Sequence, residues 1–321
     1  MENQQVITEL PRQYMIVDGH CDTIADYLLG YRDLTVRGLE GHVDLPRLRA
    51  GGVAVQFFAC FVESKYKPAH VLERGLQLVE ACRRLIDNNP NALTLLTGVD
   101  DIPKAAQRTA VLISIEGGEI LNGQAFMLSL LYRLGVRAMG LTWNYANALA
   151  GGVAEPGRLT AFGKQVVKEM NRLGMLVDVS HLSDPAFWDV VKVTEQPVIA
   201  SHSCCRTLCA HPRNLTDQQI RAIAETGGVI GINFYTEFVT GGEAGLADVI
   251  RHIDHICTLV GPDYVGIGSD FDGCLTVPKG LEDVTCLPAL ADTLLATGYK
   301  GEEVAKIMGG NFIRVIRKVI G

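Results

Sequence analysis

VVKEMNRLGMLVDVSHLS, residues 166–183, is followed at residues 197–203 by PVIASHS, and together these two segments indicate the fold. In the first segment, apolar residues at helical spacing among charged ones predict an amphipathic helix that ends at Gly174. Each segment then contains a short apolar run of the length and composition typical of a buried parallel strand. The two runs end on Ser-His pairs, which supply His181 and His202. The pattern therefore predicts two parallel strands that each carry an imidazole at the carboxyl end.

Other parts of the chain repeat this pattern of apolar strand and amphipathic helix. The expected strands cover residues 14–17, 53–61, 111–115, 136–142, 176–179, 197–200, 229–234 and 264–268, with a small extra strand at 93–97. Helices are expected at 70–87, 128–134, 166–173, 246–259, 287–296 and 301–319. Eight strands alternating with helices predict one (β/α)₈ TIM barrel, a fold that carries its chemistry at the carboxyl ends of the strands, as a single domain over residues 1–321. A doubly wound open sheet is the alternative, but no GxGxxG or Walker loop supports it.

Composition limits the classes of partner. The net charge of −7 and the lack of a basic cluster with interleaved aromatics argue against nucleic acid. No apolar run approaches the roughly 20 residues of a membrane helix, and neither end resembles an export signal or lipid anchor. Nine cysteines without a CxxC pair are expected to be free thiols. We therefore expect a cytoplasmic protein without a membrane partner, and leave open whether it forms a homodimer.

Residues that bind divalent metals follow five of the expected strands: His20, Asp22, Glu116, His181, His202 and Asp270. One such residue at a strand end is more often a hydrogen-bonded structural group than a ligand. A buried cluster of three carboxylates, however, would repel itself unless cations compensate it. Nitrogen and oxygen ligands without thiolate suit catalytic zinc, and this set is large enough for two ions.

This ligand set predicts a hydrolytic mechanism. Glu116 is the candidate bridge between two zinc ions, which would supply a bound hydroxide as the nucleophile. Asp270 would transfer the proton between water and leaving group. Arg213, in CAHPRN, either clamps a substrate carboxylate or is an ordinary surface arginine. His252 and His255 are interpreted as surface residues of the 246–259 helix.

Several motifs together resemble the membrane (renal) dipeptidase family of zinc metallopeptidases, in the form of a soluble bacterial member. They are DGHCD, SIEGGE, EMNRLGMLVDVSH, PVIASHS, HPRN, VGIGSDFDG and GGNF, and they extend from about Val17 to Val315. The resemblance implies a zinc dipeptidase on an amidohydrolase-like barrel, in which His20 and Asp22 bind one ion, His181 and His202 bind the other, and Glu116 bridges. It further implies that Asp270 transfers a proton, that Arg213 receives the C-terminal carboxylate of the substrate, and that L-Xaa-D-Xaa dipeptides are accepted.

The chain departs from the family pattern at two positions. In LTWN, Trp143 stands where mammalian members have a histidine thought to polarise the scissile carbonyl. An indole N–H donates one hydrogen bond but takes no charge, so the metals would carry more of the oxyanion stabilisation. Glu119 replaces the histidine of EGGH and changes the charge near the pocket. Two other functions remain open: hydrolysis of another small amide, such as an N-acyl amino acid or lactam, and a catalytically silent barrel.

Overall fold

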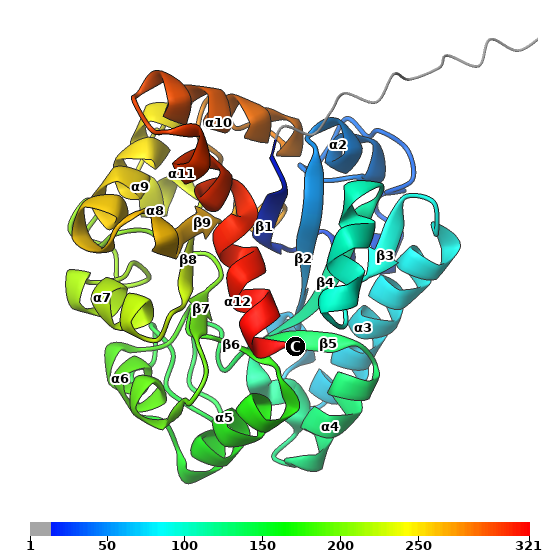
Figure 1. Cartoon of the computed structure of the whole chain (residues 1–321). Coiled ribbons are helices and arrows are strands. Elements are labelled where there is room, and N and C mark those ends of the chain that lie inside the picture. The colour runs from blue at the N-terminus through cyan, green and yellow to red at the C-terminus, as the bar shows by residue number, and fades with distance from the viewer. Residues whose placement is uncertain (1–13) are drawn as a thin grey trace, which may run out of the picture.

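A computed structural model describes residues 14–321 of the chain, which form a closed parallel barrel (Figure 1). The barrel strands are β1 (Ile16–Cys21), β2 (Val53–Phe61), β4 (Thr109–Glu116), β5 (Val136–Gly140), β6 (Leu176–Asp178), β7 (Val198–Ala200), β8 (Val229–Ile232) and β9 (Val265–Ile267). Each pairs with its neighbours, and pairing of β2 with β4 completes the ring. The short β3 (Leu93–Leu95) pairs with the start of β4. The predicted (β/α)₈ barrel and its small extra strand are confirmed.

Helices surround the barrel (Figure 1). They are α1 (Ile24–Leu29), α2 (Leu45–Ala50), α3 (Val71–Asn88), α4 (Phe126–Arg133), α5 (Ala161–Leu173), α6 (Asp184–Val193), α7 (Asp217–Glu225), α8 (Thr236–Val239), α9 (Leu246–Val260), α10 (Leu287–Ala296), α11 (Gly301–Ala305) and α12 (Asn311–Val319). The expected end of the helix at Gly174 is confirmed, because this glycine caps α5 in the left-handed conformation. Across residues 14–321 no helix has the length and apolar character needed to cross a membrane.

The predicted helix over 301–319 is wrong as a continuous element. A π-helical turn, η6 (Lys306–Gly310), separates α11 from α12, and the backbone of Gly309 is not helical. A Cβ atom at Gly309 would lie 2.0 Å from the carbonyl oxygen of Met15. The chain therefore bends at a glycine that packs directly on the backbone leading into β1.

Because of this bend, α12 lies across the amino ends of the barrel strands (Figure 1). Phe312 is fully buried there, and a Cβ atom at Gly19 or Gly266 would collide with its ring. Apolar residues from the strand starts, such as Val17 and Val229, pack in the same cluster. This end of the barrel is filled with side chains, which leaves the carboxyl ends of the strands as the place for a polar site.

Candidate metal centre

The six acidic and imidazole residues predicted for the site meet at the carboxyl ends of the strands. His20 lies within β1 and Asp22 just after it, Glu116 ends β4, and the others follow β6, β7 and β9. His181 and Asp270 have φ angles of 66° and 61°, a left-handed conformation that residues other than glycine rarely adopt. Backbone strain of this kind is often found at functional sites, where surrounding contacts maintain it.

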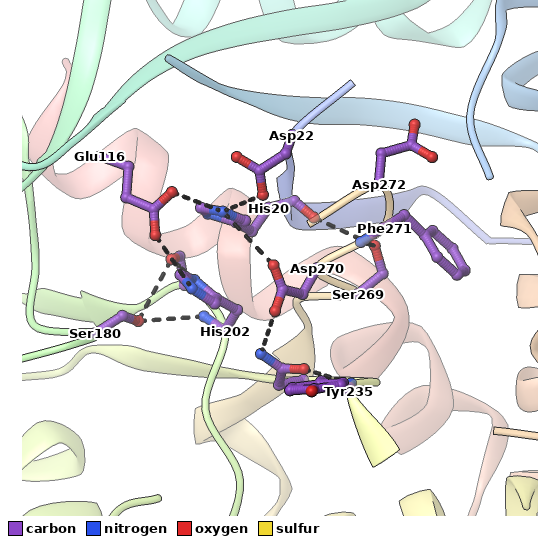
Figure 2. A network of polar contacts seen from close by, with 12 residues as sticks. His20, Asp22, Glu116, Ser180, His202, Tyr235, Ser269, Asp270, Phe271 and Asp272 are labelled. Carbon is purple, nitrogen blue, oxygen red and sulfur yellow. Dashed lines mark hydrogen bonds and ion pairs between the residues drawn. The ribbon is translucent and has the colours of Figure 1, made fainter. Parts of the chain in front are cut away.

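The two carboxylate oxygens of Glu116 face different imidazoles, and Figure 2 shows them directed towards His20 and His202. Its Oε2 is 3.6 Å from Nε2 of His20, while its Oε1 is 2.8 Å from Nε2 of His181 and 3.8 Å from Nε2 of His202. On the other side, Nε2 of His20 is 3.3 Å from Oδ2 of Asp22 and 3.9 Å from Oδ1 of Asp270. The residues expected to share two metals are therefore within a few ångströms of one another.

Hydrogen bonds behind the imidazoles determine which nitrogens carry protons. Ser201 donates its hydroxyl proton to Asp178, so its oxygen, 2.7 Å from Nδ1 of His202, accepts a proton from that nitrogen. Similarly, Nδ1 of His181 lies 2.8 Å from the amide oxygen of Asn144 and donates to it. Both Nε2 atoms are then left with lone pairs, and they face each other at 2.9 Å. A cation between or beside them would satisfy both.

Two further observations show that the residues fit divalent metal. Nε2 of His20 and Oδ1 of Asp22 are buried without a hydrogen-bond partner within residues 14–321. Two donor atoms on one tetrahedral zinc, each 2.0–2.1 Å from the ion, lie about 3.3 Å from each other. The Nε2 atom of His20 lies at similar distances from Oδ2 of Asp22 and from Oε2 of Glu116. Overlapping donor groups can be formed from His20, Glu116 and His202 and from His20, Asp22 and Asp270. All of these donors are nitrogen or oxygen, as zinc in a catalytic site prefers.

Burial and mutual contact shift the pKa values in the cluster. Burial, together with Arg213, lowers the pKa of His181 to about 4, and burial with His20 lowers that of His202 well below its usual value. Burial raises the pKa of Asp22 to about 7, helped by Glu116. His20 and His181 lower the pKa of Glu116 against the effect of burial. Neutral His181 and His202 beside an ionised Glu116 are in the protonation states that bind metal.

Asp270 forms one edge of this cluster, and two other predicted residues, Arg213 and Trp143, border it. Burial raises the pKa of Asp270, although His20 opposes the rise, and its Oδ2 accepts a 2.9 Å hydrogen bond from Asn233. Arg213 is buried, and donates from Nη1 to Ser203 and from Nη2 to the carbonyl of His202; no partner for its Nε lies within residues 14–321. The ring of Trp143 is 6.2 Å from that of His181.

The interpretation of His252 as a surface residue is wrong. Its ring is buried, with Nδ1 accepting a 3.0 Å hydrogen bond from the amide of Cys205 and Nε2 2.9 Å from the carbonyl oxygen of Val239. His255 is half-buried and pairs with Asp217. His252 thereby fixes the loop after β7, the same loop that carries Arg213. The nine cysteines are all free thiols, as expected.

Comparisons with known proteins show the family to which the chain belongs. The family model for membrane dipeptidase, peptidase family M19, matches residues 4–320. An uncharacterized dipeptidase of Schizosaccharomyces pombe is 36% identical over 98% of this chain and 83% of its own length, and dipeptidase aclJ of Aspergillus oryzae is 35% identical over 98% and 80%. A crystal structure of a metallo peptidase from Rhodobacter sphaeroides, liganded with a phosphinate mimic of the dipeptide L-Ala-D-Ala, superposes with a TM-score of 0.89. It is 28% identical and covers 95% of this chain and 99% of that one.

Proposed function

The chain belongs to the membrane dipeptidase family, peptidase family M19, and is a metallo-dipeptidase, and from this premise we propose that it cleaves dipeptides at a two-zinc centre. The observation that carries the proposal is Glu116, whose two oxygens face His20 on one side and His181 on the other. A carboxylate in this position can be shared by two ions. In this assignment His20 and Asp22 would hold one zinc, His181 and His202 would hold the second, and Glu116 would be shared by both. The whole chain acts as one barrel domain.

Zinc at this site would allow a bound water to ionise near neutral pH, and would itself act as a Lewis acid toward the carbonyl oxygen of the substrate. The chain's own residues do the rest. Asp270 is placed to hold a proton, because burial raises its pKa and Asn233 fixes one of its oxygens. Its other oxygen, Oδ1, faces His20 and the centre of the site. We assign Asp270 to pass this proton to the departing amine, as a general acid should.

Arg213 is assigned to the C-terminal carboxylate of the dipeptide. Its Nη1 and Nη2 are used to fix the guanidinium on Ser203 and on the backbone of His202. The Nε–H, buried without a partner among residues 14–321, remains free for a ligand oxygen. A guanidinium held in this way is ready to bind a carboxylate with little loss of entropy.

Trp143 and the stereochemistry of the substrate complete the proposal. The indole lies beside Phe61, with ring centroids 5.0 Å apart, and borders His181 as part of the wall of the site. It would contact the substrate without taking charge. The mimic bound by the Rhodobacter sphaeroides relative has an L residue followed by a D residue. We propose L-Xaa-D-Xaa dipeptides as substrates here also.

The test is release of amino acids from a panel of dipeptides that differ in the configuration of the second residue. A chelator should abolish the activity and added zinc should restore it, with two zinc ions bound per chain by elemental analysis. Glu116→Gln should bind less zinc and lose activity, whereas Glu169→Gln, on the outer face of α5, should do neither. N-acetylated dipeptides separate the alternatives: if they are cleaved as fast as the free dipeptides, the enzyme is a general amidase. Full activity at zero bound metal would overturn the metal assignment.

A further inference from the structure

An ion pair borders the mouth of the barrel on the side of β2 and β4. Lys67 follows the short helix η1 (Ser64–Tyr66) after β2, and Glu119 lies in η3 (Gly118–Leu121) after β4. Nζ of Lys67 is 2.9 Å from Oε1 of Glu119 and 5.2 Å from the centre of the Phe61 ring. Both side chains are about one-fifth exposed, so the pair is screened from water over most of its surface.

Lys67 satisfies only one of the two oxygens of Glu119. Oε2 is buried, and no donor within residues 14–321 forms a hydrogen bond with it. This oxygen lies over the end of β4, because a Cβ atom at Gly117 would be only 2.3 Å from it. A buried acceptor without a donor is energetically costly, and more so when it is charged. Native proteins leave few such groups, and a ligand that brings a donor is one explanation.

The position of Glu119 indicates which part of a dipeptide would reach it. Arg213, assigned to the C-terminal carboxylate, is bound to His202 after β7, and β5 and β6 separate β7 from β4. A dipeptide that starts at Arg213 and crosses Glu116 therefore directs its N-terminal residue toward β2 and β4. There the rings of Phe61 and Trp143 form an apolar wall. Lys67 lies over the Phe61 ring and pairs with Glu119. The side chain of an N-terminal residue would pass along the rings and end near Oε2.

We propose that Glu119 makes the enzyme select dipeptides whose N-terminal residue has a long side chain ending in a cation. The apolar stem packs on the aromatic wall, and the terminal ammonium or guanidinium donates to Oε2 of Glu119. Lys67 has the same sign as this cation and therefore weakens the preference. The inference rests on the proposed dipeptidase function and adds the class of substrate.

The test compares L-Lys-D-Ala with L-norleucine-D-Ala, which keeps the side-chain stem and lacks the ammonium group. We expect the wild-type enzyme to favour the lysine dipeptide by about tenfold in kcat/KM, the size of a charge-assisted hydrogen bond of about 1.5 kcal/mol. Glu119→Gln should bring this ratio close to one. Lys67→Met keeps the stem over Phe61 and should raise the ratio. The two variants thus have opposite expected effects.

Glu63→Gln is the matched control, because Glu63 precedes the same η1 helix but pairs with Arg74. Its ratio should equal that of the wild type. If both dipeptides are cleaved but the ratio of their kcat/KM values is unchanged in Glu119→Gln and in Lys67→Met, Glu119 does not select the substrate. The proposed dipeptidase function would be unaffected by that result. Cleavage of neither dipeptide, nor of any other in the panel, overturns both. If Glu119→Gln does not fold, the Lys67→Met result decides alone.

Discussion

Asp178 is expected to control zinc affinity although it touches no proposed metal ligand directly. It ends β6, is buried, and accepts 3.0 Å hydrogen bonds from the amides of Ser180 and Ser201. Its Oδ2 also takes the hydroxyl proton of Ser201, whose oxygen faces Nδ1 of His202. Asp178 therefore keeps the proton of His202 on Nδ1 and the lone pair on Nε2, where a metal would bind.

Asp178→Asn should move the ring proton of His202 from Nδ1 to Nε2. An amide NH₂ in place of Oδ2 donates to the Ser201 oxygen, so the hydroxyl proton turns toward Nδ1 of His202. The ring proton is then favoured on Nε2 and must be lost before a metal can bind. Loss of such an outer hydrogen bond typically weakens metal affinity by 10–100-fold, which corresponds to about 1.4–2.7 kcal/mol.

Competition with a chromophoric zinc chelator would measure the affinity of each variant. Asp189→Asn is the control, because Asp189 is a buried acid on α6 that accepts from Arg158 and from the amide of Leu159. Its zinc affinity should be unchanged. Ser201→Ala should weaken binding by a similar factor, and adding it to Asp178→Asn should cost little more, because both act through one chain of hydrogen bonds. Full zinc affinity in a folded Asp178→Asn protein would refute this reasoning, as would an equal loss in Asp189→Asn.

Three other substitutions have defined outcomes. Gly273→Ala would place a methyl group 2.1 Å from Oδ2 of Asp22 and 2.6 Å from Oδ1 of Asp270, so kcat/KM should fall by about 100-fold with circular dichroism unchanged. Asp272 is paired with Arg32 and His42, which lower its pKa to about 2. The lowered pKa of Asp272 contributes about 2 kcal/mol of unfolding free energy at pH 7, which is lost as pH falls from about 4 toward 2. Asp272→Asn should therefore be destabilised in urea unfolding at pH 7, with chelator present, and by about half as much at pH 3. Phe312→Ala, at the closed end of the barrel, should lose about 3–5 kcal/mol of unfolding free energy and keep its kcat/KM at 25 °C; a large activity loss in the folded variant would contradict the separation of the two ends.

The fold and the proposed ligands could be predicted because both depend on the same local pattern. A buried parallel strand is a short apolar run, and the first polar residues after it lie at the mouth of the barrel whatever the rest of the chain does. His181 and His202 could be placed in this way without any long-range information. Their shared neighbour Glu116 followed from the same argument applied to β4.

The hydrogen-bond partners behind the ligands were missed, because they depend on which strands are neighbours. Asn144 reaches His181 from the loop after β5, and Asn233 reaches Asp270 from the end of β8. One signal was present in the sequence. Asp178 precedes Ser180 by two residues, as Asp18 precedes His20, and alternate residues of a strand share one face. An acid at that position could have been expected to support the site.

The errors elsewhere also have physical causes. His252 is three residues after Val249 and four before Ile256, both buried, so helical spacing places it on the apolar face of α9. Two hydrogen bonds satisfy both nitrogens of this polar ring in the core. The break before α12 is marked by two consecutive glycines, Gly309 and Gly310, but their role becomes clear only where Gly309 meets the backbone of Met15. Contacts this distant in sequence have no local signature.

Three of the proposed ligands are anchored from behind by other residues of the folded chain. His202 is held through Ser201 and Asp178, His181 through Asn144, and the backbone around His20 through Asp18, which accepts from Ser269. These anchors are hydrogen bonds of the folded chain and need no ion to form. Metal binding should therefore load a site that folding has already built, unlike small zinc domains in which metal and fold form together. It follows that Asp178→Asn should bind zinc more weakly because its His202 carries the proton on Nε2. The loss of zinc-binding free energy should exceed the loss of unfolding free energy, when unfolding is measured with chelator present.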